Sequence, residues 1–407
     1  MRKPFSILLI PFILTLLISG CAAYDKIIAI IPYEKQPLDE ESLAEIAAYI
    51  PESTLDDILH DFYTYQTVEG LQKTNQILEQ EPDNPMALAL LAVFALQENN
   101  LKNANDYARQ ALKKNTNLSL AHSIRAWVLY KSENRLLAAE RECKIALSLE
   151  PDSSIAYTIC SQIYVASEDN EDGLRYLKKA VELEPNNIFA IYYLCYMLVY
   201  QNSAEEAIAP IEHAVELNPD LEFLIYERGY VYFFSGKYDL ALKDFNDLIE
   251  KGWKDQYLYD YRGYIYSQTG NLEAALKDYR RALLLDPDNA RLNNNVAYYM
   301  TFLDQDLNEA LTYAEKAVSL EPESDYAIDT KAYLFYKLGR YDEALELFNG
   351  LIDRDATYAH FGRAFVYFDL GQYDLAKEDI TLYMQLYPED NLYIYAEKLL
   401  EDINHLP

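Results

Sequence analysis

The sequence predicts an all-α fold, an α-solenoid in which about ten helical hairpins stack one on the next. Three observations support this prediction. A pattern repeats about every 34 residues, prolines recur at the same spacing, and small residues hold fixed places within each period. Repeats of this length are typical of paired helices that bury their apolar faces against neighbouring pairs.

The period is clearest over residues 222–289, where one pattern is written twice at an offset of 34 residues. Gly229 recurs as Gly263, and Gly236 recurs as Gly270. The same offset relates Ala241, Leu242, Lys243 and Asp244 to Ala275, Leu276, Lys277 and Asp278. A repeated pair of helices joined by a turn accounts for this self-similarity.

Prolines continue the same spacing along the chain, with one proline missing at each of three places. They stand at Pro82, Pro151, Pro185, Pro219, Pro287, Pro322 and Pro388. Each tends to follow a short acidic or polar stretch at the end of a predicted helix, as in the segments SLEPDSS and LLDPDN. Proline lacks the backbone donor that a continuing helix needs, so we expect it to end one hairpin and begin the turn to the next.

Small residues mark the points where the two helices of a hairpin are expected to approach closely. Alanine stands at about the twentieth position of most periods, as Ala104, Ala139, Ala207, Ala241, Ala275, Ala310, Ala344 and Ala376. Three of these alanines close the pattern Tyr-Asp-x-Ala, which begins at Tyr238, Tyr341 and Tyr373. Together with the period and the prolines, these residues resemble the tetratricopeptide repeat.

The resemblance implies a right-handed superhelix over residues 51–390. Its ten predicted repeats are 51–84, 85–118, 119–153, 154–187, 188–221, 222–255, 256–289, 290–324, 325–356 and 357–390. The first of these matches the pattern least well. Apolar residues at helical spacing predict a capping helix at each end of the array, over residues 39–50 and 391–407.

The chain begins with a predicted secretory signal. Arg2 and Lys3 precede an apolar run that is too short to span a bilayer comfortably. The run ends in Ile18-Ser19-Gly20-Cys21, which is similar to the lipobox of bacterial lipoproteins. An ordinary signal with an incidental cysteine and an uncleaved anchor are the alternatives.

The lipobox resemblance implies that residues 1–20 are a lipoprotein signal peptide and that Cys21 carries the lipid. Residues 21–38 would then be a lipidated tether, and the acyl chains would hold the protein on a membrane. No Asp follows Cys21, since the next residues are Ala22 and Ala23. In a diderm bacterium, the resemblance favours the outer membrane, with the protein facing the periplasm.

The composition is strongly acidic, with 66 Asp and Glu residues, 35 Lys and Arg residues, and a formal charge of −31. Such a surface repels phosphate backbones, so we expect no nucleic-acid partner. Basic, neutral or metal-bridged partners are favoured. Alternatively, the charge only keeps a long solenoid soluble.

The remaining cysteines, Cys143, Cys160 and Cys195, fall at small-residue packing positions of their repeats. We expect them to be buried as core residues rather than to form a structural disulfide. If one bridge forms, Cys143–Cys160 is favoured, because the second helix of one repeat packs on the first helix of the next. The spacings match no zinc site.

We find no pattern that predicts catalysis. The five histidines do not pair at helical spacing, and neither a phosphate-binding glycine loop nor a GxSxG motif occurs. We therefore nominate no catalytic residue, expect no metal or cofactor, and predict a non-enzymatic protein. An enzyme remains the lowest-ranked alternative.

Aromatic residues, including 38 tyrosines, are the most distinctive feature of the repeats. By the resemblance, one face of each first helix lines a concave groove, and aromatic residues are enriched in binding hot spots. The predicted groove residues are Tyr192, Tyr196, Tyr200, Phe223, Tyr226, Tyr230, Phe233, Tyr257, Tyr264, Tyr299, Tyr333 and Phe365. We expect recognition to concentrate between the fifth and tenth repeats.

These observations favour a membrane-anchored, non-catalytic scaffold that binds proteins of the cell envelope, such as secretion machinery, and assists in assembling or regulating their complex. Groove positions lack the Lys and Asn set with which related domains clamp a carboxylate, so that mode is disfavoured. A carbohydrate-binding or polysaccharide-export accessory protein is the alternative, because tyrosine rings stack on sugars and a glycan is a possible ligand.

Overall fold

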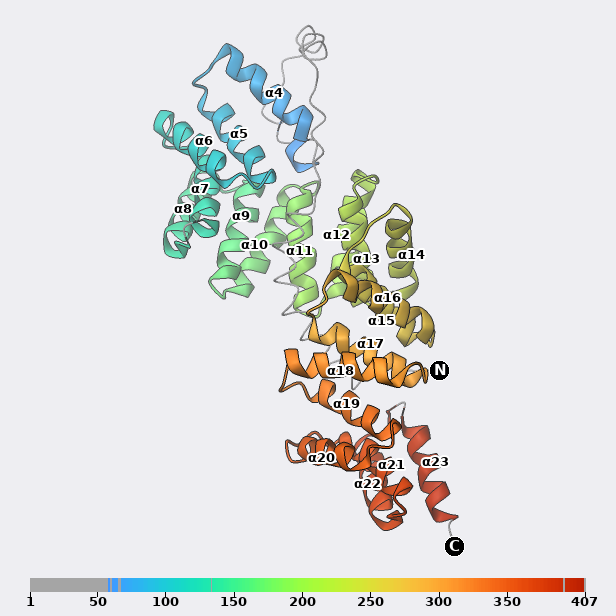
Figure 1. The fold of residues 1–407 in the computed structure, drawn as a ribbon. Helices are drawn as coiled ribbons and strands as arrows, with labels where there is room; N and C mark the ends of the chain where they lie inside the picture. The colour runs from blue at the N-terminus through green and yellow to red at the C-terminus, as the bar shows by residue number, and fades with distance from the viewer. Residues whose placement is uncertain (1–57, 59–60, 65–66, 133, 391, 406–407) are drawn as a thin grey trace. The chain divides into compact units, whose positions relative to one another are not determined.

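A computed structural model describes residues 58, 61–64, 67–132, 134–390 and 392–405 (Figure 1). The predicted signal peptide, the tether with Cys21, and the predicted capping helix over residues 39–50 lie outside these residues. All regular secondary structure in the described part of the chain is helical. The protein is therefore an all-α solenoid of packed helical hairpins.

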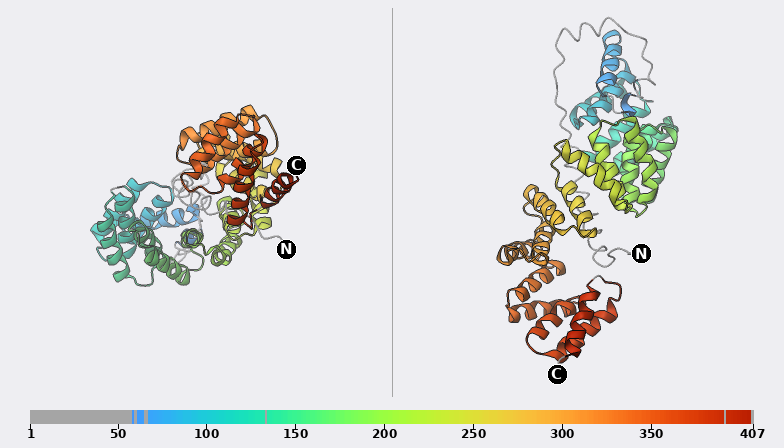
Figure 2. Two further views of the ribbon diagram at one scale, coloured as in Figure 1. Left: turned by 90° about the horizontal axis from the view of Figure 1, so that it is seen from below. Right: turned by 90° about the vertical axis from the view of Figure 1, so that its right-hand side faces the viewer.

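The described residues form two compact units. We call residues 58–244 the N-terminal unit and residues 245–405 the C-terminal unit. The boundary falls within helix α14, Tyr238–Glu250. Figures 1 and 2 show that each unit consists of antiparallel helix pairs placed side by side.

The N-terminal unit contains the helices up to the boundary in α14. They are α4 Thr67–Gln80, α5 Pro85–Gln97, α6 Leu101–Lys114, α7 Ser119–Lys131, α8 Leu136–Leu149, α9 Ser154–Ala166, α10 Asn170–Leu183, α11 Ile188–Tyr200, α12 Ala204–Leu217 and α13 Glu222–Phe234. From residue 85 onward, each predicted repeat in this unit holds two helices.

The C-terminal unit continues the same alternation. Its helices are α15 Gln256–Gln268, α16 Leu272–Leu285, α17 Ala290–Phe302, α18 Leu307–Leu320, α19 Asp325–Lys337, α20 Tyr341–Ile352, α21 Ala359–Asp369, α22 Tyr373–Leu386 and α23 Tyr393–Asn404. The last of these packs on α22 at the end of the stack, within the segment where the sequence predicts a capping helix.

The alanines at the twentieth position explain how the hairpins close. All eight of them have 0% exposed surface, because each lies where the second helix of a hairpin meets its neighbours. The repeated glycines Gly236 and Gly270 have another role. They end the first helix with positive φ angles of 71° and 79°, a conformation that glycine adopts without a steric cost.

A recurring ion pair joins the two helices of three hairpins, between residues 16 positions apart. Arg262 on α15 binds both carboxylate oxygens of Asp278 on α16, through Nε at 2.7 Å and Nη2 at 2.8 Å. The same bidentate contact pairs Arg228 with Asp244 and Arg363 with Asp379. These contacts explain why aspartate recurs at this position of the sequence repeat.

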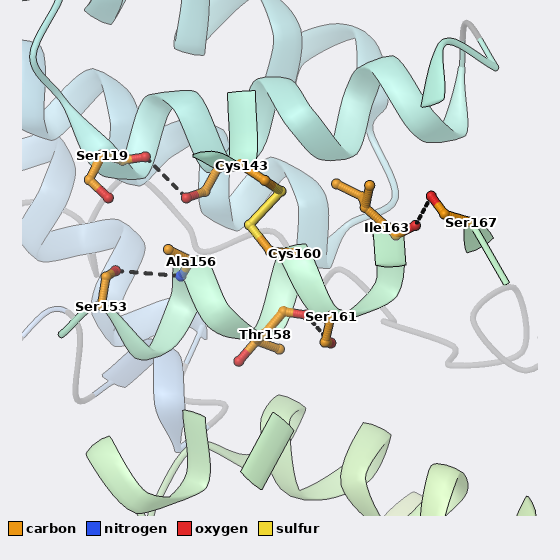
Figure 3. The surroundings of a disulfide bond; sticks show 10 residues. Ser119, Cys143, Ser153, Ala156, Thr158, Cys160, Ser161, Ile163 and Ser167 are labelled. Carbon is orange, nitrogen blue, oxygen red and sulfur yellow. Dashed lines mark hydrogen bonds between the residues drawn. A yellow bond between two sulfur atoms is a disulfide. The ribbon is translucent and has the colours of Figure 1, made fainter. Parts of the chain in front are cut away.

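Cys143 on α8 and Cys160 on α9 form a disulfide, with their Cα atoms 5.6 Å apart (Figure 3). The expectation that these cysteines serve only as core residues is therefore wrong for this pair. The favoured alternative pairing is correct, because the second helix of one hairpin packs on the first helix of the next. Cys195 is a buried free thiol, as expected.

Candidate functional site

A pocket with a volume of about 420 Å³ lies within the N-terminal unit. Its walls come mainly from the first helices of successive hairpins, α5, α7, α9, α11 and α13. These helices pack side by side, so that each contributes residues to one continuous surface. Phe62, from the first predicted repeat, completes the wall.

Aromatic rings form one side of this pocket. Phe62 stacks on Phe189 of α11 with ring centroids 5.0 Å apart, although the two residues belong to distant repeats. Phe62 also meets Phe94 of α5 edge to face, at 6.2 Å. Tyr192 of α11 contacts Phe223 of α13 in the same way, at 6.5 Å. Such rings offer a large, rigid contact area to a ligand.

Two polar side chains of the pocket are bound or covered within the protein. The Asn187 side chain accepts a hydrogen bond from the Ala190 amide at 3.1 Å and donates to Ser154 Oγ at 2.8 Å. The Gln97 amide nitrogen, in contrast, is buried and donates to no acceptor within the described residues. The walls of this pocket are therefore mainly apolar and suit apolar side chains, with Asn99 and Lys131 among the polar residues that line it.

The predicted groove residues of the N-terminal unit differ in exposure and in whether they line the pocket. Tyr192 and Phe223 line the pocket, and Tyr200 is 42% exposed at the end of α11. Tyr196 and Tyr230 are half-buried. Tyr226 and Phe233 are only 5% and 6% exposed, so their rings belong to the packed interior.

The predicted groove residues of the C-terminal unit are half-buried or buried. Tyr257, Tyr299, Tyr333 and Phe365 are half-buried, whereas Tyr264 is 8% exposed. Tyr299 stacks on the buried Tyr279 at 5.3 Å, which places its ring against α16.

Several pocket residues escaped the sequence analysis, among them Phe62, Trp127 and Ile159. They belong to the first four predicted repeats, where the sequence places mostly small and aliphatic groove residues. The pocket therefore begins nearer the N-terminus than the sequence predicts. A search for isolated aromatic residues in these early repeats would have found Phe62 and Trp127.

Glu227 on α13 is an unusual buried acid in this unit. It is 6% exposed, and no hydrogen bond or ion pair reaches its carboxylate from the described residues. Burial raises the pKa of Glu227 to about 8. The charge of Glu227 acts on Tyr192 and Cys195 of α11, which places the carboxyl group between α11 and α13.

Asp329 on α19 is a second acid with an altered environment, in the C-terminal unit. Burial, together with the nearby Asp325 carboxylate, raises the pKa of Asp329 to about 7. Burial, and to a lesser degree the charge of Asp329, raises the pKa of five tyrosines. They are Tyr298, Tyr326, Tyr333, Tyr358 and Tyr383. Asp329 therefore lies among aromatic rings.

In the described part of the chain, no group of three or more His, Cys, Asp or Glu residues is arranged to hold a metal ion. No described helix is both long enough and apolar enough to cross a membrane.

Comparison with known families places the helical hairpins in a defined class of repeats. Residues 156–187 match the family described as tetratricopeptide repeat, and residues 263–301 match one described as TPR repeat. Residues 304–378 match the family described as anaphase-promoting complex, cyclosome, subunit 3. The chain thus contains tetratricopeptide repeats in both of its units.

Solved structures with a similar fold include MamA from Desulfovibrio magneticus RS-1. It is 23% identical over 42% of this chain and 97% of its own, with a TM-score of 0.38. Pseudomonas aeruginosa pilF is 17% identical over 54% of this chain and 96% of its own, with a TM-score of 0.44. A tetratricopeptide repeat protein from Parabacteroides merdae is 18% identical over 60% of this chain and 97% of its own, with a TM-score of 0.36. No curated protein sequence matches this chain.

Proposed function

We propose that this protein is a lipid-anchored, non-catalytic scaffold that binds segments of cell-envelope proteins in the groove formed by its first helices. The pocket of the N-terminal unit is the observation that carries the proposal. Its aromatic and aliphatic walls fit the apolar side chains of a bound segment. Tetratricopeptide repeats typically serve as interaction scaffolds.

The disulfide supports a location outside the cytoplasm. Structural disulfides form and persist in oxidising compartments such as the bacterial periplasm, whereas cytosolic thiols are kept reduced. The Cys143–Cys160 pair is therefore in keeping with the predicted signal peptide and with lipidation of Cys21. These two independent features support export to the envelope.

Lipidation can be tested by substituting Cys21 with serine in the full chain and expressing both forms in a diderm bacterium. The wild-type protein is expected to lose residues 1–20, to gain the mass of the acyl groups, and to fractionate with the outer membrane. The Cys21→Ser variant is expected to keep its signal peptide. Intact-mass spectrometry checks both results, and a wild-type protein without added lipid mass would refute the anchor.

The pocket can be tested with the double variant Trp127→Ala and Tyr192→Ala. Both side chains are half-buried, so their loss is expected to leave the helical stack folded. Cross-linking in cells, followed by mass spectrometry, measures how much of each partner is bound. We expect the cross-linked amount of a small set of envelope proteins to fall at least tenfold in the double variant. That estimate assumes that each aromatic anchor contributes about 1–2 kcal/mol to binding.

The matched control is Tyr373→Ala, which removes a tyrosine that is 41% exposed on α22, outside the N-terminal unit. It is expected to leave the cross-linked proteins unchanged. If the double variant also leaves them unchanged while its circular dichroism stays native, the pocket does not bind the partner. Loss of binding to purified polysaccharide instead would favour the carbohydrate-binding alternative.

A further inference from the structure

Within the described residues, a carboxylate on the first helix of one hairpin binds a guanidinium group from the next hairpin. Asp260 is the fifth residue of its repeat, and Arg291 is the second residue of the following repeat. Arg291 donates to Asp260 through both terminal nitrogens, one of them at 2.9 Å from Oδ1. The Asp260 and Arg291 side chains are only 2% and 15% exposed, so this pair is largely removed from water.

Two repeats further along, the same two positions carry Asp329 and Tyr358. The arginine that serves Asp260 is thus replaced by a tyrosine. The Tyr358 ring stacks on Tyr326 with centroids 5.8 Å apart and planes 2° apart, and the Tyr358 hydroxyl is buried without a hydrogen-bond partner in the described residues. The second position therefore has a carboxylate, that of Asp329, as the first has that of Asp260. It has no arginine in the position of Arg291.

Neighbouring cations are already bound to other carboxylates. Arg354 lies 2.8 Å from Asp325, and the Lys337 ammonium lies 2.6 Å from Asp304. No hydrogen bond or ion pair to Asp329 occurs within the described part of the chain. The raised pKa of Asp329 reflects burial without a compensating cation.

A cation that approached Asp329 would meet aromatic rings as well as the carboxylate. Arginine suits such a place because its guanidinium group stacks on aromatic faces and forms paired hydrogen bonds to a carboxylate. The strongly acidic chain, with its formal charge of −31, further favours the approach of a basic segment.

We propose that Asp329, together with Tyr326 and Tyr358, binds an arginine side chain of the partner protein in the groove of the C-terminal unit. The bound guanidinium group pairs with Asp329 as the Arg291 guanidinium pairs with Asp260. This inference rests on the proposed scaffold function and gives its partner a defined chemistry, a segment that carries at least one arginine.

The test begins with a display library of random dodecapeptides selected on the full-length protein and, in parallel, on the Asp329→Asn variant. We expect arginine to be enriched at least fivefold at one peptide position with the wild-type protein and to lose that enrichment with the variant. The variant removes a half-buried carboxylate that has no ion pair within the described residues, so its thermal stability is expected to stay close to that of the wild type. A loss of binding then cannot come from unfolding.

Selected peptides are next synthesised with arginine or with citrulline, its uncharged analogue. Citrulline is expected to weaken binding at least tenfold with the wild-type protein and less than twofold with Asp329→Asn. The control is Glu346→Gln, which removes a charge from an exposed residue of α20 and is expected to preserve the preference for arginine.

Equal affinity for arginine and citrulline, or selection of no peptide at all, would overturn this proposal. The scaffold function is judged separately, by the cross-linking of the Trp127 and Tyr192 double variant. If that variant loses its partners while Asp329→Asn behaves as the wild type, the scaffold function stands and only the arginine site is wrong.

Discussion

Replacing Asp278 with asparagine is expected to lower the free energy of unfolding by about 3–5 kcal/mol. Asp278 is 1% exposed, and it accepts two hydrogen bonds from Arg262, itself 8% exposed. The neutral amide leaves a buried guanidinium group without its counter-charge, while Asn246 still accepts one hydrogen bond from it at 2.6 Å. Denaturant unfolding of the full chain, followed by circular dichroism, measures the loss.

The matched control is Asp288→Asn, which breaks the pair between Lys316 and Asp288 in the same unit. The Lys316 and Asp288 side chains are 41% and 82% exposed. Removing this pair is therefore expected to lower the free energy of unfolding by less than about 1 kcal/mol. Equal losses of unfolding free energy in the two variants would show that the buried Arg262–Asp278 pair stabilises the protein no more than the exposed pair does.

Replacing Glu227 with glutamine is expected to stabilise the protein, and the gain is expected to grow with pH. Burial raises the pKa of this carboxyl group to about 8 from an ordinary value of 4.5, so the folded protein favours the protonated form. The wild type is therefore most stable, with respect to this group, below about pH 4.5. It loses roughly 1.4 kcal/mol per pH unit as the pH rises toward 8.

Glutamine cannot ionise, so the Glu227→Gln variant does not lose stability in this way as the pH rises. The difference in free energy of unfolding between Glu227→Gln and the wild type is expected to be on the order of 3 kcal/mol larger at pH 8 than at pH 5. Glu346→Gln provides the exposed control, whose difference is expected to stay constant. A pH-independent difference for Glu227→Gln would show that the carboxyl group reaches solvent or a cation when it ionises.

Much of the fold could be predicted because its signals are local and repeated. The alanines at the twentieth position are all buried, and the repeated glycines take the positive φ angles that a helix end requires. A period of about 34 residues fixes the number of helices between prolines. The recurring Asp244 and Asp278 were visible as a pattern, but their arginine partners became evident only in the structure.

The candidate site was harder to predict, because a residue lines a groove only if its side chain points toward that face of the helix. Successive residues of a helix point about 100° apart, so an error of one position exchanges a groove residue for a core residue. Tyr299 was predicted in the groove, and its half-buried ring stacks on the buried Tyr279 of α16. Tyr226 and Phe233 were also predicted there, but their rings are buried in the structure.

The sequence by itself determined the repeat, the helical hairpins and the points of close helix packing, since each depends on residues within one period. Only the tertiary structure decided which aromatic residues share a pocket and which acids lack a cation. Phe62 meets Phe189 because hairpins distant in the sequence converge within one unit, and Cys143 bonds to Cys160 because neighbouring hairpins bring their Cα atoms within 5.6 Å. Contacts between repeats depend on how the hairpins pack together, and no single period of the sequence encodes that packing.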